Sequence, residues 1–297
     1  MLKVALVGVG GISGCHIPTW ESMEETELVA LCDVRPERFE PYEGKRCYTD
    51  FDEMLEKEEI DILDICLPSY MHPEFSIKAM NKGINVLCEK PISLKKEDVA
   101  PIYEAAKRNN VKFMVAHVLR FWPEFDYVKQ VVKSGKYGKV MSGFVQRLNH
   151  MPRTSWDGWM FDEKRSGFVP FDLHIHDLDF LVYTFGEPKD FSCKRVKTAD
   201  SDYVNVMYDY GDFFIGGEAS WYQQMSPFKA GFRFQFETKC EFFCFVRVGT
   251  DDYRDIHLFH DRQEPSRWIK VSAAFLVDAS CVDFNNQIFF FYQSQSL

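Results

Sequence analysis

Residues 172–179 read Asp-Leu-His-Ile-His-Asp-Leu-Asp and form the densest cluster of titratable groups in the chain. On a helix, Asp172, His176 and Asp179 would share one face at the spacing i, i+4 and i+7, an arrangement suited to proton transfer. His174 would then point about 160° away from His176, because each residue turns the helix by about 100°. On a strand, His174 and His176 would share a face, as metal-binding His-x-His pairs do. The backbone that carries the cluster decides between these two chemistries.

A second set of residues has the spacing of a phosphate-binding turn. Gly8-Val9-Gly10-Gly11-Ile12-Ser13 follows a short apolar run and opens a segment that can form a helix. Such a turn lets the backbone approach a pyrophosphate at a helix N-terminus. Asp33 follows about 20 residues later, where its carboxylate can accept hydrogen bonds from a ribose and repel a 2′-phosphate. We therefore expect NAD as the cofactor, with NADP possible because Arg35 lies close to Asp33. The alternative is a glycine turn that binds nothing.

The first 115 or so residues alternate between strand-like and helix-like segments. Strands are expected at 3–7, 27–32, 61–67, 84–88 and 111–116, and helices at 11–22, 51–58, 73–82 and 95–110. Short apolar strands that alternate with helices are typical of a doubly wound parallel sheet. The glycine turn and Asp33 then both follow strands of this sheet, where a dinucleotide binds.

The pattern changes after about residue 120. One more helix is expected at 123–134, and then β-rich aromatic stretches follow at 139–148, 203–210, 213–221 and 232–248. Consecutive strands with short turns predict a mostly antiparallel open sheet. We therefore expect an α/β fold with two domains: a Rossmann doubly wound parallel sheet at 1–119 and an α+β domain for substrate binding and oligomerisation at 120–297.

Two further segments carry a family resemblance. They are Asp61-Ile-Leu-Asp-Ile-Cys-Leu-Pro-Ser-Tyr-Met-His72 and Ala79-Met-Asn-Lys-Gly-Ile-Asn-Val-Leu-Cys-Glu-Lys-Pro91. With the glycine turn, His16 and the cluster at 172–179, they resemble the glucose–fructose oxidoreductase / inositol dehydrogenase (Gfo/Idh/MocA) family. Glu89-Lys90-Pro91 is the most specific of these motifs. The likeness covers residues 1 to about 190 and is vague after about 225.

The resemblance implies an NAD(P)-dependent dehydrogenase that acts on a secondary alcohol of a sugar, inositol or related polyol. It places Lys90 beside the nicotinamide and the substrate hydroxyl, where a cation favours loss of the hydroxyl proton. It also implies a helix on which Asp172 and His176 face the nicotinamide, with His176 as the acid/base and Asp172 binding a substrate hydroxyl. Cofactor contacts are expected from Gly8, Gly10, Gly11, Ile12, Asp33, Arg35, Leu67, Pro68, His72, Glu89 and Lys90.

Two positions depart from the family's second motif, which here runs from Ser166 to Asp179. His174 replaces a commonly small residue and Phe168 a usual glycine, so both are expected to narrow the pocket. Together with His174, aromatic and arginine side chains between the motifs are expected to bind a polyol: Arg120, Trp122, Arg153 and Trp156. Ordinary packing of these aromatic residues is an equally good interpretation.

Composition limits the other possibilities. The formal net charge is −10, which argues against nucleic-acid or anionic-membrane partners because those need a basic surface. No apolar run reaches the roughly 18 residues needed to span a bilayer. The nine cysteines are scattered, so we expect reduced thiols, a cytoplasmic protein and no metal site, including at Cys240 and Cys244.

The end of the chain fits the family poorly, because residues 241–297 have almost no glycine and finish on a run of aromatic residues. We expect this part to be divergent, truncated or frame-shifted. By resemblance, a homodimer or tetramer would form through the C-terminal sheet. Two other functions remain open: a non-catalytic NAD-binding regulator on the same fold, and a metal-dependent hydrolase that uses His174-x-His176.

Overall fold

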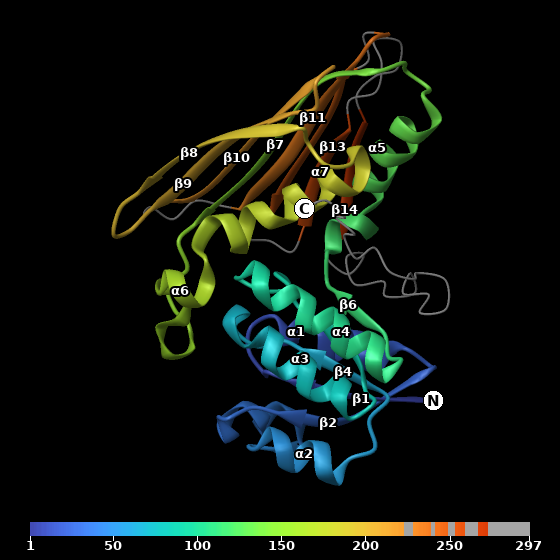
Figure 1. Ribbon diagram of the computed structural model, residues 1–297, viewed down its shortest axis with the longest axis vertical. Helices are drawn as coiled ribbons and strands as arrows, with labels where there is room; N and C mark the ends of the chain where they lie inside the picture. Colours follow the sequence, from blue (N-terminus) through green and yellow to red (C-terminus); the bar gives the residue numbers. More distant parts are fainter. Residues whose placement is uncertain (223–227, 239–240, 249–252, 259–266, 273–297) are drawn as a thin grey trace. The chain divides into compact units, whose positions relative to one another are not determined.

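The computed structural model describes residues 1–222 and 228–238 with their side chains, and the backbone of strands at 241–248, 253–258 and 267–272 (Figure 1). The chain divides into two compact units, one that contains Met1–Ala116 and another that begins at His117. The prediction of a divergent or truncated end falls largely on residues outside these described ranges. Within those ranges, no helix is long and apolar enough to cross a membrane.

The first unit is built on a parallel sheet, as predicted, with six strands where five were expected. Its strand order is β3-β2-β1-β4-β5-β6. The strands are β1 (Leu2–Val7), β2 (Thr26–Cys32), β3 (Arg46–Tyr48), β4 (Ile62–Ile65), β5 (Asn85–Cys88) and β6 (Phe113–Val115). The helices are α1 (Ser13–Ser22), α2 (Phe51–Lys57), α3 (His72–Asn81) and α4 (Val99–Asn109).

Helices cover both faces of this sheet, which is why its central strands are mostly apolar. Ile17 and Trp20 of α1 pack in one hydrophobic cluster with Val4 and Leu6 of β1. A second hydrophobic cluster packs side chains of α2, α3 and α4 against other residues of the sheet. These include Ala5 of β1, Leu63 of β4 and Val86 of β5. Strand order reverses between β1 and β4, so the ends of these two strands form the switch point where ligands bind in such sheets.

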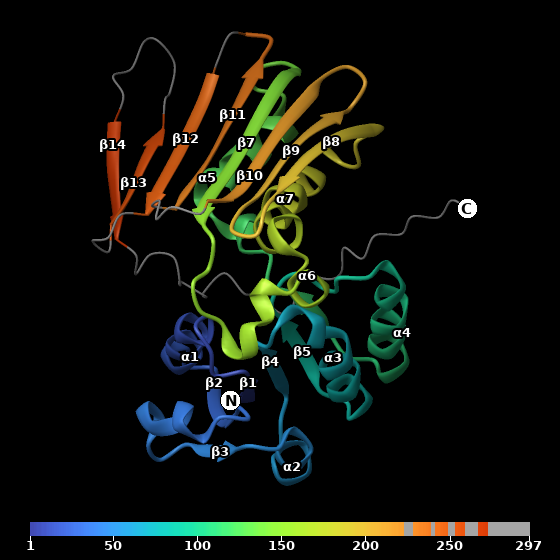
Figure 2. The same cartoon turned by 90° about the vertical axis from the view of Figure 1, so that its left-hand side faces the viewer.

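The second unit is an eight-stranded sheet with helices on one face (Figure 2). Its order is β14-β13-β12-β11-β7-β10-β9-β8, and all described pairings are antiparallel except β7 with β10. The strands are β7 (Val140–His150), β8 (Asp190–Lys197), β9 (Asp202–Asp209), β10 (Phe214–Tyr222), β11 (Lys229–Phe236), β12 (Glu241–Val248), β13 (Tyr253–Leu258) and β14 (Arg267–Ser272). The mixed, mostly antiparallel sheet confirms the predicted fold class.

Three helices accompany this sheet: α5 (Pro123–Ser134), α6 (Glu163–Ser166) and α7 (Ile175–Phe185). A π-helical turn at Pro170–His174 leads directly into α7. Phe125 of α5 and Phe180 of α7 lie edge-on at 4.8 Å between ring centroids, and Phe125 also contacts Phe232 of β11 at 4.9 Å. This aromatic core fixes α7, which carries His176, against the sheet.

Candidate functional site

The glycine turn after β1 requires glycine at its first position. Gly8 has φ +96°, and a Cβ atom there would lie 2.5 Å from the carbonyl oxygen of Cys66 at the end of β4. Both the backbone conformation and the close approach of the two strand ends exclude a side chain. The turn is therefore fixed to the switch point of the sheet.

The outer side of the same turn is open. A Cβ atom on Gly10 or Gly11 would meet no other atom within 4 Å, and Ile12 is 45% exposed. Ser13 donates its hydroxyl to the Gly10 carbonyl at 2.8 Å, which joins the turn to the first residue of α1. An open backbone surface before a helix N-terminus fits the pyrophosphate of a dinucleotide, which needs exposed backbone N–H groups.

Asp33, at the end of β2, is buried and held by two residues. It accepts a hydrogen bond from the backbone N–H of Val9 at 2.9 Å. The Arg35 guanidinium binds both of its carboxylate oxygens at 2.9 Å. The residue therefore lies beside the glycine turn as predicted, but its carboxylate is covered by the arginine that was expected to modify the cofactor preference.

Glu89-Lys90-Pro91 follows β5 on the same carboxyl edge, next to Leu67-Pro68 at the end of β4. His72 connects these two segments, with Nδ1 2.7 Å from the Pro91 carbonyl and Nε2 2.8 Å from the Leu67 carbonyl. The pKa of His72 is lowered, because burial disfavours the charged ring more strongly than the two carbonyl groups favour it. The histidine of the family motif thus braces the motif that contains Lys90.

A buried polar cluster in this unit was not predicted. Asp64 lies on β4 with no exposed surface and accepts hydrogen bonds from Trp20 Nε1 at 2.6 Å and His16 Nδ1 at 2.8 Å. The other nitrogen of His16 lies 3.1 Å from Glu89 Oε1. The only sequence signal was an acid inside the apolar run 61–67, because an unpaired charge there would be costly.

The cluster at 172–179 is helical, which confirms the first of the two geometries. The π-helical turn carries Asp172, and α7 carries His176, both half-buried. The strand alternative is wrong, so His174 and His176 do not share the face that a strand-borne metal pair would need. The sequence did not predict the π-helical turn, a feature often found at functional sites.

His174 contacts the sheet of its own unit. It is 4% exposed, and its Nε2 lies 2.7 Å from the hydroxyl of Tyr208 on β9. A Cβ atom on Gly217 would lie 2.7 Å from the His174 ring. Burial lowers the pKa of His174 more than nearby Asp177 raises it. These contacts anchor helix to sheet, and they do not support the predicted narrowing of a substrate pocket.

Phe168, the second departure from the family motif, is also explained by packing. Its φ is +57°, a conformation that favours glycine, and it follows Gly167 at φ +70°. Its ring is 8% exposed and lies 5.9 Å from the ring of Trp221 on β10. Burial of the ring offsets the backbone strain of about 1 kcal/mol, which explains how a phenylalanine occupies this position.

The four remaining substrate candidates belong to two segments of the second unit, 120–122 and 153–156. Arg120 forms a two-point ion pair with Asp179 of α7, at 2.8 and 2.5 Å, and His117 Nε2 lies 3.5 Å from the same carboxylate. Trp122 packs on Phe125 at 6.0 Å. Arg153 is exposed, and Trp156 is half-buried at the start of the short helical segment Trp156–Phe161. Arg120 and Trp122 therefore have packing partners, and a role in substrate binding stays a prediction for all four.

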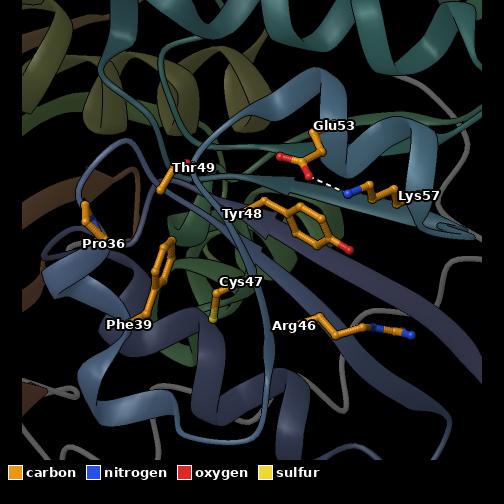
Figure 3. Close-up of a pocket in the computed structure, with 8 residues that line it drawn as sticks. All are labelled: Pro36, Phe39, Arg46, Cys47, Tyr48, Thr49, Glu53 and Lys57. Carbon is orange, nitrogen blue, oxygen red and sulfur yellow. Dashed lines mark hydrogen bonds and ion pairs between the residues drawn. The ribbon is translucent and has the colours of Figure 1, made fainter.

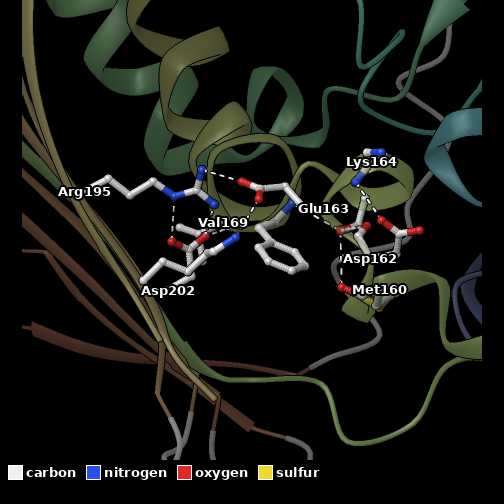
Figure 4. A network of polar contacts seen from close by, with 10 residues as sticks. Met160, Asp162, Glu163, Lys164, Val169, Arg195 and Asp202 are labelled. Atoms are coloured by element: carbon white, nitrogen blue, oxygen red, sulfur yellow. Dashed lines mark hydrogen bonds and ion pairs between the residues drawn. The ribbon is translucent and has the colours of Figure 1, made fainter. Parts of the chain in front are cut away.

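A polar network fastens the segment before α7 to the β8–β9 hairpin (Figure 4). Asp202 of β9 is 2% exposed and pairs with Arg195 of β8 at 2.7 and 2.8 Å. It also accepts a hydrogen bond from the backbone N–H of Val169 at 3.1 Å, and Arg195 extends to Glu163 of α6 at 2.7 Å. The entry to the helix is thus held by a buried acid that no sequence motif indicated.

One pocket in the described part of the first unit lies beside the edge strand β3 (Figure 3). It is lined by Pro36, Phe39, Arg46, Cys47, Tyr48, Thr49, Glu53 and Lys57. Its charged side chains are already paired, Lys57 with Glu53 at 2.5 Å and Arg46 with Glu58 at 2.9 Å. No predicted site residue lines this pocket.

Comparison with known proteins gives two matches to one family. A family model described as an oxidoreductase family with an NAD-binding Rossmann fold, Gfo/Idh/MocA, matches residues 2–117. The C-terminal domain model of the same family matches residues 125–243. The two matches together account for most of the chain.

Individual relatives agree with these matches. The chain is 30% identical over 189 residues to D-apiose dehydrogenase of Paraburkholderia graminis, covering 62% of this chain and 50% of that protein. It is 28% identical over 191 residues to myo-inositol 2-dehydrogenase of Thermotoga maritima, covering 63% and 55%. The chain thus spans about half the length of the curated relatives it matches. Levoglucosan dehydrogenase in complex with NADH shares the fold, with a TM-score of 0.75, 19% identity, and coverage of 91% of this chain and 80% of that one.

Proposed function

The chain belongs to the Gfo/Idh/MocA oxidoreductase family, and from this premise we propose that it is an NAD(P)-dependent dehydrogenase acting on a secondary alcohol of a sugar, inositol or related polyol. One observation carries the proposal. The open glycine turn after β1 and the Glu89-Lys90-Pro91 motif after β5 lie on the same carboxyl edge of one parallel sheet. Ligands of such sheets bind at that edge.

The names of relatives support the substrate class. Matching proteins include a D-apiose dehydrogenase, a myo-inositol 2-dehydrogenase and a glucose-6-phosphate 3-dehydrogenase. All three names describe oxidation of a sugar or cyclitol. We therefore propose a polyhydroxylated substrate for this chain, with the particular polyol left to experiment.

The bound nicotinamide would supply the hydride acceptor or donor. We propose that the Lys90 ammonium lies beside the reacting hydroxyl and favours loss of its proton through its positive charge. His176 would take that proton as the acid/base, and Asp172 would accept a hydrogen bond from a substrate hydroxyl and so orient it. Both residues come from one helical segment, which keeps their spacing constant.

NAD⁺ and NADP⁺ should each be titrated into the protein, and turnover measured with a panel of polyols. We expect NAD⁺ binding, and turnover that falls at least about 100-fold in Lys90→Met and in His176→Gln. Absence of binding to either cofactor at millimolar concentration would refute the proposal. Binding without turnover on any polyol would instead support a non-catalytic NAD-binding regulator.

A further inference from the structure

His16 of α1 lies between two carboxylates and has no role in the function proposed above. Its Nδ1 is 2.8 Å from Asp64 Oδ2 and its Nε2 is 3.1 Å from Glu89 Oε1. Carboxylates only accept, so both contacts are hydrogen bonds only when both ring nitrogens carry a proton. Burial disfavours this charged ring, but the two acids outweigh burial and raise the pKa of His16 far above its ordinary value.

The buried carboxylate of Asp64 requires the His16 ring to be charged. The acid lies on a central strand with no exposed surface, where an uncompensated carboxylate would be strongly destabilising. Trp20 Nε1 donates to the same oxygen at 2.6 Å, but the indole brings no charge. His16 is therefore the cation that Asp64 needs.

Glu89 connects the ring to the motif that contains Lys90. It is 7% exposed, and its second oxygen lies 3.1 Å from the backbone nitrogen of Lys90. Burial favours the neutral acid, but the hydrogen bond from His16 and the charge of Lys90 outweigh burial and lower the pKa of Glu89. A fixed anion is thus held directly before the lysine.

We propose that His16 is a positioning residue: it holds Glu89 as a fixed carboxylate, and Glu89 in turn fixes the backbone and the charge environment of Lys90. The inference deepens the proposed function and rests on it, because Lys90 acts on a substrate only if the chain is an oxidoreductase. His72 braces the other side of the motif through the Pro91 carbonyl, so the lysine is held from both sides.

A metal ion is a competing occupant of this cluster. His16, Asp64 and Cys66 offer ligand atoms that all lie within 4.8 Å of one another. A metal would require a thiolate and a neutral imidazole. Burial raises the pKa of the Cys66 thiol, and the two acids hold His16 in its charged form, so both residues favour protons over a metal.

The kinetic test compares His16→Gln and Glu89→Gln with the wild-type protein. Each variant removes one charge and keeps much of the side-chain volume. We expect kcat to fall at least about tenfold in both. In His16→Gln the Kd for NADH, followed by its fluorescence, should change less than about threefold. The kcat of the double variant should be no lower than that of the less active single variant, because both substitutions break the same chain of contacts.

Trp20→Phe is the matched control, because it removes the indole hydrogen bond to Asp64 and does not alter the contacts of Glu89. It should lower Tm and keep kcat within about twofold of wild type. An equal loss of kcat in Trp20→Phe and His16→Gln would show a merely structural role and overturn the proposal. Unchanged kcat in Glu89→Gln would overturn it as well, including when His16→Gln fails to fold.

A third measurement does not depend on activity. In the cofactor-free protein labelled with ¹⁵N-histidine, the His16 ring should carry protons on both nitrogens at pH 8 by NMR. A neutral ring at that pH would contradict the charged network. A shift of the His16 ring resonances on addition of stoichiometric Zn²⁺ would contradict it as well. If the wild-type protein turned over no polyol, the proposed function would fail together with the role of Lys90, and the NMR spectrum would still decide whether the charged network exists.

Discussion

Single glycines in the turn after β1 have separable roles. Gly8 has a positive φ, and a Cβ atom added there would clash with the backbone of Cys66. A Cβ atom added at Gly10 would have no other atom within 4 Å. We expect Gly8→Ala to destabilise the protein by about 2–4 kcal/mol, because both backbone strain and a clash with a strand end oppose it. Gly10→Ala should change stability by less than about 1 kcal/mol and still weaken NADH binding at least about tenfold, since the methyl group fills space kept for the pyrophosphate.

Thermal denaturation and NADH titration of both variants test this separation. Equal Tm values for Gly8→Ala and the wild-type protein would contradict the clash. Unchanged NADH affinity in Gly10→Ala would show that the open side of the turn is not the cofactor site.

Arg35 should control the choice between cofactors. Its guanidinium occupies both oxygens of Asp33, the carboxylate expected to bind a ribose. In Arg35→Ala this carboxylate is free to accept ribose hydroxyls and to repel a 2′-phosphate. We expect the ratio of kcat/KM for NAD⁺ over NADP⁺ to rise at least about tenfold, equivalent to about 1.4 kcal/mol. Arg38→Ala, which loses a contact to the Val9 carbonyl, is the control, and an equal rise there would contradict a role specific to Arg35.

At the scale of elements, the segment that enters α7 depends on one buried acid of the β8–β9 hairpin. Asp202→Asn removes a buried carboxylate and leaves Arg195, whose side chain is 30% exposed, paired with Glu163 alone. We expect a loss of about 2 kcal/mol in the free energy of unfolding, because hydrogen bonds to a charged acceptor are lost. Lys197→Gln, at an exposed pair with Glu163 in the same network, should cost less than about 1 kcal/mol.

Urea denaturation measures both values, and hydrogen exchange at residues 160–169 locates the effect. Protection should fall there first in Asp202→Asn, because the Val169 N–H and the Arg195 guanidinium then compete for the single amide oxygen that remains. A uniform loss of protection over the second unit would contradict a local role for the network.

Elements with an apolar pattern could be predicted from the sequence, and exposed ones could not. Strands β1, β2 and β4 are largely buried on both faces and β5 is buried on one, so each is a mostly apolar run that predicts a strand. Strand β8 is exposed at all eight residues and lies at the sheet edge, so no burial pattern marks it. Strand β3 has only three residues. The β-rich stretch expected at 232–248 covers parts of two antiparallel strands, β11 and β12, because aromatic residues are frequent in both strands.

The candidate site was predictable only where a local motif exists. The glycine turn and Glu89-Lys90-Pro91 are local in sequence, and both were placed correctly on the sheet edge. The contact between His16 and Glu89 joins residues 73 positions apart, and that between Arg195 and Asp202 needs two paired strands. Residue spacing contains no information about such contacts, so Asp64 and Asp202 were identified only in the structure.

At the scale of the whole molecule, two buried histidines and the half-buried His16 shape the dependence of stability on pH. His72 and His174 have lowered pKa values in the fold, so between those values and about 6.5 the unfolded chain binds more protons. The contribution of these two residues to the free energy of unfolding is complete above about pH 6.5 and declines as the pH falls below that value. His16 has a raised pKa, so its contribution is complete below about pH 6.5 and declines as the pH rises above it.

These opposite slopes predict a maximum of Tm near pH 6.5 over the range from about 5 to 8.5. Removing one histidine should flatten one side of that curve. His16→Gln should abolish the decline above pH 6.5, because the variant has no group that the fold keeps charged beyond the point where the unfolded chain loses its proton. His174→Gln should reduce the decline below pH 6.5, since the variant has no ring there for the unfolded chain to protonate. Calorimetry of the three proteins in buffers of constant ionic strength tests this, and a wild-type Tm that rose steadily from pH 6.5 to 8.5 would contradict a charged His16.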